Sequence, residues 1–328
     1  MKYVRLQGQR RKLVLSLAGS ATLSLGTRSF AQSFPSKPVR LVVPLPPGGA
    51  TDFIARSLGQ RIGAALGQSV VIENKPGANQ MIGVMDVVRA APDGHSLLFG
   101  QSSILLNPLV SSSVQYDVAR DLVPVSLVCD SFAYFVTPAS NPARSFQEFV
   151  AWAKSQSSKL AFGTAGAGSA SHVYGVLINQ RNGLEMAHVP YRGEAPIVPD
   201  LISGRIQAAF LSGLTALQLA KEGKLRIIAG IGGGRSPSTP DVPTLGELGM
   251  VDVDGWYGVF APRGTSMAIV DRIAAEFDKA LQDPDIREKM ASSSLGPKGG
   301  TPKDFQAAIA KAQDAWTRVI KETGVRTD

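Results

Sequence analysis

Apolar residues in this chain follow two alternating patterns: short runs typical of buried strands, and longer stretches with helical spacing. The run 40–45 ends at the loop 46–49, which is followed by apolar residues at helical spacing: Ile54, Ala55, Leu58 and Ile62. A strand that leads directly into a helix is the building block of parallel β-α-β units. The pattern therefore predicts an α/β fold in which ligands bind beyond the carboxyl ends of the strands.

The order of strand, small-residue loop and helix occurs in two halves of the chain. Further strands are predicted at 69–73, 96–100, 123–129, 132–137, 160–162, 186–191, 206–211, 225–230 and 256–261. Helices are predicted at 77–91, from 145 through 152, after the loop 163–172, from 195, at 266–282, after 284 and at 301–323. We therefore expect one lobe from residues 32–131 and 245–328, a second lobe from 132–244, and a ligand cleft between them.

The loop 46–49, with the sequence PPGG, is the first candidate ligand site. A ligand can approach glycine backbone closely, and the unpaired N–H groups of the following helical turn carry partial positive charge. This arrangement suits an anion such as a carboxylate or a phosphate. The candidate residues are Pro47, Gly48, Gly49 and Thr51. Asp52 fits two roles equally, as a ligand contact or as the partner of Arg56 one helical turn away.

The loop 163–172 is the second candidate site. Its order Gly166-x-Gly168-x-x-Ser171 is close to a dinucleotide-binding fingerprint, but a serine replaces the third glycine. Its backbone and hydroxyl donors suit a carboxylate equally well: Thr164, Gly168 and Ser169. His172 is either an ordinary residue of the following helix or a ligand contact.

Polar residues also follow two other predicted strands. Tyr191 and Arg192 come after the strand 186–191, and Arg192 is either a bidentate partner for a carboxylate or an exposed surface arginine. The polar loop after the strand 96–100 begins a further set of candidate hydrogen-bond donors: Ser102, Ser103 and Asn107.

The basic excess of the chain lies mainly in a predicted export signal. The chain has 34 Lys and Arg against 26 Asp and Glu, a net charge of +8. Six basic residues and no acidic ones lie in residues 1–31, so the remainder has 28 basic against 26 acidic residues. A basic start, an apolar run and small residues before Ala31 predict a signal peptide of residues 1–31, cleaved near Ala31. The adjacent Arg10 and Arg11 suit either a Sec or a twin-arginine signal. Nucleic acid is therefore not an expected partner.

The chain lacks the motifs that usually mark a catalytic centre. It has neither a G-x-S-x-G elbow nor a Walker loop, and its three histidines show no metal-ligand spacing. The single cysteine, Cys129, lies in an apolar run and is expected to be a small buried residue. We therefore expect a binding protein without catalytic residues, cofactor or metal.

Ordered motifs run from Phe34 to the C-terminus: FPSKPVRLVVPLPPGGATDFIAR, VVIENKPGA, FGTAGAGSASH, VPYRGEAP, DLISGRIQAAF, RSPSTPDVPTLGELG, WYGVFAPRGT and DPDIREKM. Together they resemble the Bug family of periplasmic solute-binding proteins, the receptors of tripartite tricarboxylate transporters. The resemblance implies a type II periplasmic-binding-protein fold, in which two lobes close over a ligand. One departure concerns the cleft: where relatives commonly have Gly-Gly-Asn, this chain has the bulkier Asn79-Gln80-Met81.

The resemblance also implies a function. It implies a monomeric periplasmic receptor that captures a small carboxylate between the loops 46–49 and 163–172 and delivers it to the membrane subunits of a tripartite tricarboxylate-type transporter. Two alternatives stay open: a ligand-sensing receptor for a membrane signalling partner, and an exported dinucleotide-dependent or hydrolytic enzyme. The ligand itself stays open among di- and tricarboxylates, acidic amino acids and aromatic carboxylates.

Overall fold

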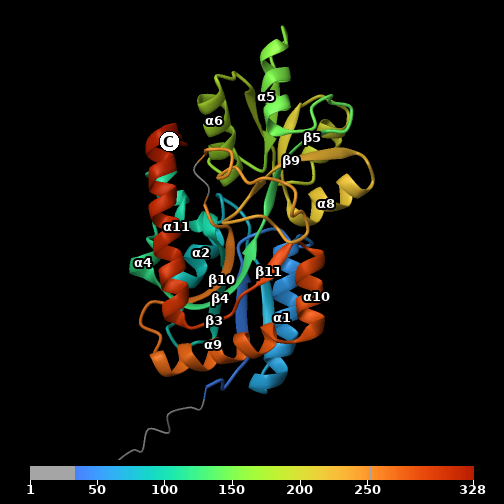
Figure 1. Cartoon of the computed structure of the whole chain (residues 1–328). Coiled ribbons are helices and arrows are strands. Elements are labelled where there is room, and N and C mark those ends of the chain that lie inside the picture. The colour runs from blue at the N-terminus through green and yellow to red at the C-terminus, as the bar shows by residue number, and fades with distance from the viewer. Residues whose placement is uncertain (1–33, 251–252) are drawn as a thin grey trace, which may run out of the picture. The chain divides into compact units, whose positions relative to one another are not determined.

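The computed structural model describes residues 34–250 and 253–328, so the predicted signal peptide lies outside the described residues. The strands form two sheets within one compact unit, Phe34–Asp328. In Figure 1 the strands of the first sheet lie in the lower part, and β5 and β9 of the second lie in the upper part. The lobe boundaries predicted from the sequence stay a prediction. The strand order shows which strands share a sheet, but it does not show where one lobe ends and the other begins.

The first sheet has six strands in the order β11-β4-β10-β3-β1-β2. Their bounds are β1 (Val39–Val43), β2 (Val70–Asn74), β3 (Ser96–Gln101), β4 (Leu122–Ser131), β10 (Trp256–Pro262) and β11 (Leu295–Pro297). β1 pairs in parallel with β2 and β3, whereas β10 is antiparallel to both β3 and β4. The parallel β-α-β units predicted from the sequence are present in β1, β2 and β3, while the antiparallel strands β10 and β11 make the sheet as a whole mixed.

The second sheet has five strands in the order β7-β6-β8-β5-β9. Their bounds are β5 (Ala133–Pro138), β6 (Ala161–Thr164), β7 (Ala187–Pro190), β8 (Ala208–Ser212) and β9 (Leu225–Ile231). β6 is parallel to β7 and β8, and β5 is antiparallel to β8 and β9. A single residue, Phe132, separates β4 of the first sheet from β5 of the second.

The helices agree with most of the predicted ones. Their bounds are α1 (Ala50–Leu66), α2 (Met81–Val88), α3 (Asn107–Val110), α4 (Val118–Asp121), α5 (Phe146–Ser155), α6 (Ala170–Asn182), α7 (Ile197–Ile202), α8 (Gly213–Lys221), α9 (Met267–Leu281), α10 (Pro284–Ser292) and α11 (Pro302–Thr323). Two expectations were wrong: the helix predicted from 77 begins at 81, and the loop after β3 turns at once into the 3₁₀ helix η1 (Ser102–Leu105). The first error has a local cause, because three residues before α2 have positive φ.

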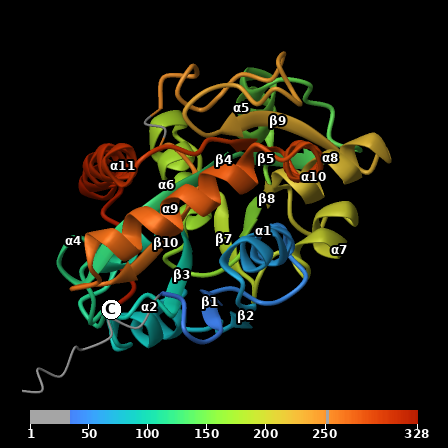
Figure 2. The same cartoon turned by 90° about the horizontal axis from the view of Figure 1, so that it is seen from below.

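The alternation of side chains along β1 explains how helices cover both faces of the first sheet. Val39, Leu41 and Val43 belong to one buried cluster, together with apolar residues of α1 and α9. Val42 points to the opposite face and belongs to a cluster with residues of α2 and α11. Seen from below, α9 lies across β4, and it also contacts α1 (Figure 2). These helices thus pack on the two faces of the sheet and not on the carboxyl ends of β1 and β3.

Helix α11 joins the two sheets. Thr301 and Asp304 form a capping box at its start, as predicted, and Gly324 ends it in a left-handed conformation. Near its C-terminal end, Arg181 of α6 forms an ion pair with Glu322. The helix therefore packs on the first sheet and is tied to α6 of the second.

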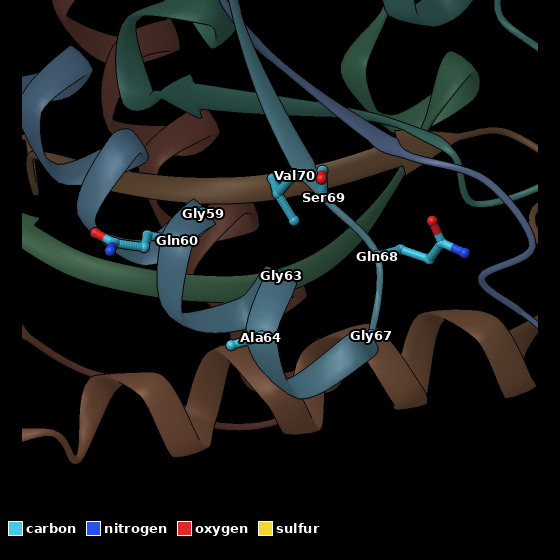
Figure 3. A pocket seen from close by; sticks show the side chains of 8 residues that line it. All are labelled: Gly59, Gln60, Gly63, Ala64, Gly67, Gln68, Ser69 and Val70. Carbon is cyan, nitrogen blue, oxygen red and sulfur yellow. The ribbon is translucent and has the colours of Figure 1, made fainter.

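Three glycines along α1 have a structural explanation. Gly59 and Gly63 precede Gly67, which ends the helix in a left-handed conformation. A Cβ on Gly59 would lie 3.0 Å from Ile72 Cδ1, and one on Gly63 would lie 3.0 Å from the carbonyl oxygen of Gln68. These glycines let the chain return closely to β2, and the small side chains leave the shallow hollow shown in Figure 3. The hollow lies at the end of α1 remote from the loop 46–49.

Two further predictions concern burial. Cys129 is fully buried, as predicted, and burial raises the pKa of its thiol well above the usual value. Within residues 34–250 and 253–328, no helix is both long enough and apolar enough to cross a membrane.

Gly258 in β10 supplies a test of this packing. A Cβ on this glycine would lie 2.0 Å from Cζ of the fully buried Phe305, which packs edge-on against Trp256 at a centroid distance of 5.1 Å. We expect Gly258→Ala to lower the free energy of unfolding by about 1–3 kcal/mol in urea titrations, because the core must shift to accept a methyl group.

Gly234→Ala is the matched control, since a Cβ there meets nothing within 4 Å. The control should stay within about 0.5 kcal/mol of the unmodified protein. Equal stability of the two variants would show that the contact between α11 and β10 is looser than described.

Candidate functional site

The loop between β1 and α1 leaves the N-terminus of a helix uncovered. Residues 46–49 are exposed, and a Cβ on Gly48 or Gly49 would meet nothing within 4 Å. Gly48 has φ +89°, a conformation that glycine adopts without strain. Gly49 is the N-cap residue, and no side chain accepts a hydrogen bond from the first turn of α1. The first N–H groups of α1 therefore open onto free space.

Asp52 holds this loop in place. Its carboxylate is buried and accepts hydrogen bonds from Gly48 N at 3.0 Å, from Arg56 Nε at 3.0 Å and from Asn74 Nδ2 at 2.9 Å. Burial alone would raise the pKa of Asp52, but these donors together hold it below its usual value. The pairing with Arg56 allowed by the sequence is therefore present, and the carboxylate ties the loop to the end of β2. Thr51 is also buried and bonds to the hydroxyl of Tyr257.

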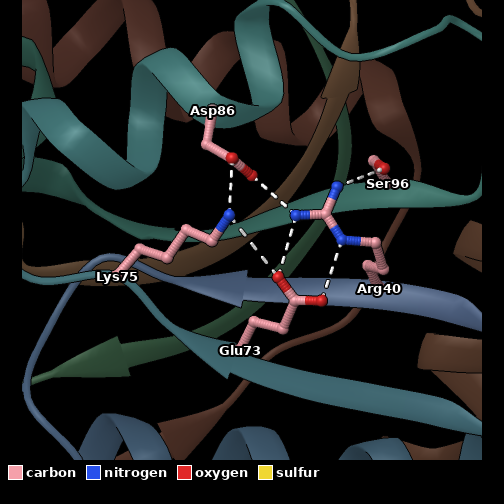
Figure 4. A network of polar contacts seen from close by, with 5 residues as sticks. All are labelled: Arg40, Glu73, Lys75, Asp86 and Ser96. Carbon is pink, nitrogen blue, oxygen red and sulfur yellow. Dashed lines mark hydrogen bonds and ion pairs between the residues drawn. The ribbon is translucent and has the colours of Figure 1, made fainter.

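An ion-pair network fixes the adjacent segment between β2 and α2 (Figure 4). Arg40 makes a bidentate contact with Glu73 at 2.9 and 2.8 Å and also reaches Asp86 at 2.8 Å. Lys75 donates to Asp86 at 2.6 Å. Burial alone would raise the pKa of Asp86, but hydrogen bonds from Lys75 and Arg40 hold it below its usual value. Since Lys75 follows β2 and Asp86 lies in α2, their ion pair brings the two ends of this segment together.

The segment fixed in this way has an unusual backbone. Ala78, Asn79 and Gln80 have φ values of 44°, 49° and 75°, which side-chain-bearing residues rarely adopt. Asn79 Nδ2 donates to Asn107 Oδ1 at 2.7 Å and lies 3.4 Å from the carbonyl oxygen of Gly168. This contact links the strand ends of the first sheet to the loop 163–172 of the second.

Of the three candidate donors after β3, Asn107 is fully occupied. Asn107 is buried, and its amide donates to Asn79 O at 2.5 Å and to the Tyr116 hydroxyl at 3.0 Å. Both amide hydrogens are thus used within the protein. Ser103 is half-buried and accepts a hydrogen bond from Gln80 Nε2 at 2.7 Å, while Ser102 is half-buried at the start of η1.

The loop 163–172 is closed by its own side chains. Ser169 caps α6 by accepting from His172 N at 3.3 Å, and its hydroxyl donates to Gly166 O at 2.6 Å. Gly168 N donates to His172 Nδ1 at 3.1 Å. A Cβ on Gly168 would lie 2.7 Å from Cγ2 of Thr327, so the C-terminal tail packs against this loop. The N-terminus of α6 is therefore capped, unlike that of α1.

Two histidines support the base of the loop. The rings of His172 and His188 are stacked with centroids 3.9 Å apart, and His188 Nε2 lies 2.6 Å from Oγ1 of the buried Thr164. Burial lowers the pKa of His172, and burial together with His172 lowers that of His188 to about 4. Both imidazoles are therefore neutral at neutral pH.

The polar residues after β7 differ in whether their side chains already have a partner within the protein. The Tyr191 hydroxyl donates to Asp200 at 2.7 Å, and burial, with Asp200, raises its pKa to about 12. Arg192 is exposed and forms no ion pair with any residue that the structure describes. Glu194, which the sequence analysis did not single out, accepts from Ser212 N at 2.7 Å and from Ser212 Oγ at 2.9 Å. A protein carboxylate thus bonds the N-cap residue of α8, next to the N–H groups of its first turn.

Comparison with known proteins decides the family. Residues 54–325 match the family model described as the tripartite tricarboxylate transporter family receptor. The chain belongs to this family. The receptor is 34% identical to Protein BugT of Bordetella pertussis over 310 residues, which cover 93% of this chain and 95% of BugT.

Solved structures agree with this membership. "R. palustris Rpa4515 with adipate" superimposes with a TM-score of 0.80 at 30% identity, over 89% of this chain and 99% of that one. MatC from Rhodopseudomonas palustris with bound malate superimposes with a TM-score of 0.76 at 29% identity, over 88% and 100% of the two chains. The family and the two-lobed α/β fold expected from the motifs are confirmed, and the family consists of periplasmic solute-binding receptors.

The stacked histidines predict a pH dependence of stability. An unfolded histidine has a pKa of about 6.5, so the unfolded receptor binds protons more readily than the folded one. The contribution of the pair to the free energy of unfolding should therefore fall as the pH is lowered from about 6.5 to about 4. Urea titrations across this range should show a shallower slope for His188→Gln, because one of the two groups is removed.

Gly234→Ala, which changes no titratable group, is the control and should keep the original slope. A slope unchanged by His188→Gln would show that the stacked pair does not titrate as inferred.

Proposed function

We propose that the protein is an extracytoplasmic receptor that captures a small carboxylate in a cleft between its lobes and delivers it to the membrane subunits of a tripartite tricarboxylate-type transporter. The observation that carries the proposal is the uncapped start of α1 behind Gly48 and Gly49. Of the helices that follow β1, β6 and β8, α6 is capped by Ser169 and α8 is occupied by Glu194. Among these three, α1 is the helix whose N-cap residue bonds neither a capping side chain nor a carboxylate, and the N–H groups of its first turn suit an anion.

A carboxylate is the anion that structural relatives support. The donors are backbone N–H groups beside two glycines with open space, and they require only a compact acceptor. Two structural relatives carry dicarboxylates, adipate in one and malate in the other, and this supports the ligand class. The exposed and unpaired guanidinium of Arg192 is the second candidate partner for a carboxylate.

The proposed roles of the remaining candidate residues follow from how their polar groups are used. Pro47, Gly48 and Gly49 form the wall against which the ligand lies, with Ser102 and Ser103 beside it. Several others use their polar groups within the protein and act by positioning the loops: Thr51, Asp52, Asn107, Thr164, Gly168, Ser169, His172 and Tyr191. Capture then proceeds by closure of the lobes about segments near residues 130 and 240.

Export and delivery complete the proposal. The signal peptide predicted at residues 1–31, through the Sec or the twin-arginine route, places the mature receptor in the periplasm as a monomer. A signalling role would use the same site and differ only in the membrane partner. Recovery of unchanged ligand after incubation with the receptor would separate capture from the enzymatic alternative.

Gly49→Val tests the site directly. Gly49 has φ −84° and ψ 173°, which valine adopts without strain, whereas Gly48 has a left-handed backbone. The valine side chain would fill the space in front of α1. We expect calorimetric titration with adipate, malate and related dicarboxylates to show a loss of affinity of about tenfold or more, which corresponds to about 1.4 kcal/mol.

Gly234→Val is the matched control, because Gly234 also has open space and no left-handed φ. It should leave affinity unchanged, and both variants should keep the original melting temperature within a few degrees. Retained affinity in a folded Gly49→Val receptor would refute the assignment of the site to α1.

A further inference from the structure

Gln80 has a buried amide with one unused end. Its side chain is 5% exposed, and its Nε2 donates to Ser103 Oγ at 2.7 Å. Its Oε1 is buried and has no hydrogen-bond partner among the residues that the structure describes. A buried polar atom without a partner costs free energy, so such an atom calls for an explanation.

The orientation of the amide is the favourable one. Rotation by half a turn would let Ser103 donate to Oε1, but it would then leave both hydrogens of Nε2 without acceptors. An under-satisfied carbonyl oxygen is tolerated more often in proteins than an orphaned N–H group. The free atom is therefore an acceptor, and its partner must be a donor.

The backbone at Gln80 gives a second reason to look for function. Gln80 is the N-cap residue of α2 with φ 75°, and it follows two other left-handed residues. Each such conformation costs on the order of 1 kcal/mol and persists only where the surroundings impose it. Here the ion pair of Lys75 with Asp86 and the bonds of Asn79 impose it. Rigid and strained segments of this kind gather at ligand sites.

The position of Gln80 relates it to the proposed carboxylate site. β1 lies between β2 and β3 in the sheet, so the chain segments that follow these three strands leave the same edge. The loop 46–49 follows β1, the segment containing Gln80 follows β2, and Ser103 follows β3. An acceptor from the second segment, held on a serine of the third, thus stands at the edge where α1 begins.

We propose that Gln80 is a specificity-determining residue whose Oε1 accepts a hydrogen bond from a hydroxyl or ammonium group of the ligand. The proposal rests on the proposed function and narrows it to carboxylates that carry a donor next to the carboxylate, such as 2-hydroxy- and 2-amino-dicarboxylates. Ligands without the donor leave the acceptor unpaired and bind more weakly.

Matched ligand pairs test the proposal. Calorimetric titration of the mature receptor should compare malate with succinate and aspartate with succinate, since each pair differs only in the donor. We expect at least one donor-bearing ligand to bind about tenfold or more tightly than succinate.

Substitutions then assign the preference to Gln80. Gln80→Met keeps the length of the side chain and removes the acceptor. The ratio of the affinity for the donor-bearing ligand to the affinity for succinate should therefore fall toward one. This fall should come from weaker binding of the donor-bearing ligand, with the affinity for succinate little changed. Gln80→Gly should lose the preference as well and also relieve the left-handed backbone, which keeps the test valid if the methionine variant folds poorly. Gln68→Met, in the hollow at the far end of α1 (Figure 3), is the matched control and should keep the ratio.

The outcomes separate the two proposals. A receptor that binds dicarboxylates without preferring a donor, or a preference that survives in both Gln80 variants, overturns the role of Gln80 and leaves the carboxylate site standing. A receptor that binds none of these ligands, nor any other carboxylate in a library of such pairs, overturns the proposed function and with it the role of Gln80.

Discussion

The three hydrogen bonds to the buried carboxylate of Asp52 determine how the first sheet presents its edge. One donor comes from the loop after β1, one from α1 and one from the end of β2, so a single side chain fixes three segments. The negative charge of Asp52 balances part of the positive partial charge at the N-terminus of α1. The exposed side of that helical turn stays free. The loop 46–49 therefore holds its shape without a capping side chain. Space for a ligand then follows from the absence of side chains at Gly48 and Gly49.

Backbone donors and side-chain acceptors divide recognition between them in the proposed site. N–H groups at the start of a helix attract any compact anion, because they respond to charge and not to the rest of the molecule. Discrimination between carboxylates must then come from side chains at the same edge. Gln80, with an unpaired acceptor at this end of the first sheet, is one candidate, and Arg192, exposed after β7 of the second sheet, is another. They favour different features of a ligand, a donor in the first case and a second carboxylate in the other.

Much of the fold could be predicted from the sequence because it depends on local patterns. The spacing of Ile54, Leu58 and Ile62 predicts α1, and the box of Thr301 and Asp304 predicts the start of α11. The parallel direction of β1, β2 and β3 could be predicted from the alternation of strands and helices, whereas the antiparallel pairing of β10 could not, because it depends on long-range contacts that no local pattern records.

The site shows the same division between local and distant causes. The glycine loop could be found from the sequence. The hydrogen bonds from the Asn107 amide to Asn79 and Tyr116 could not, because these partners lie far apart in the chain or outside any motif. The left-handed backbone at Asn79 and Gln80 explains why relatives commonly have glycines there, and it also explains why α2 begins later than its sequence suggests. Asn79 and Gln80, whose side chains are expected to alter the cleft, thus adopt a backbone conformation that glycine adopts more easily.

The hydrogen bond from the Asn79 side chain to the Gly168 carbonyl oxygen bears on how the proposed closure of the lobes could depend on a ligand. At 3.4 Å, this hydrogen bond between the strand ends of the two sheets is long, and a bond of that length contributes little by itself. The tail residue Thr327 packs on the same glycine, so the protein's own contacts at this point are few but already formed. A ligand shifts the balance between open and closed forms only by its difference in affinity for them. In the proposed receptor, the weak contact at this point therefore leaves the ligand's own contacts to supply that difference.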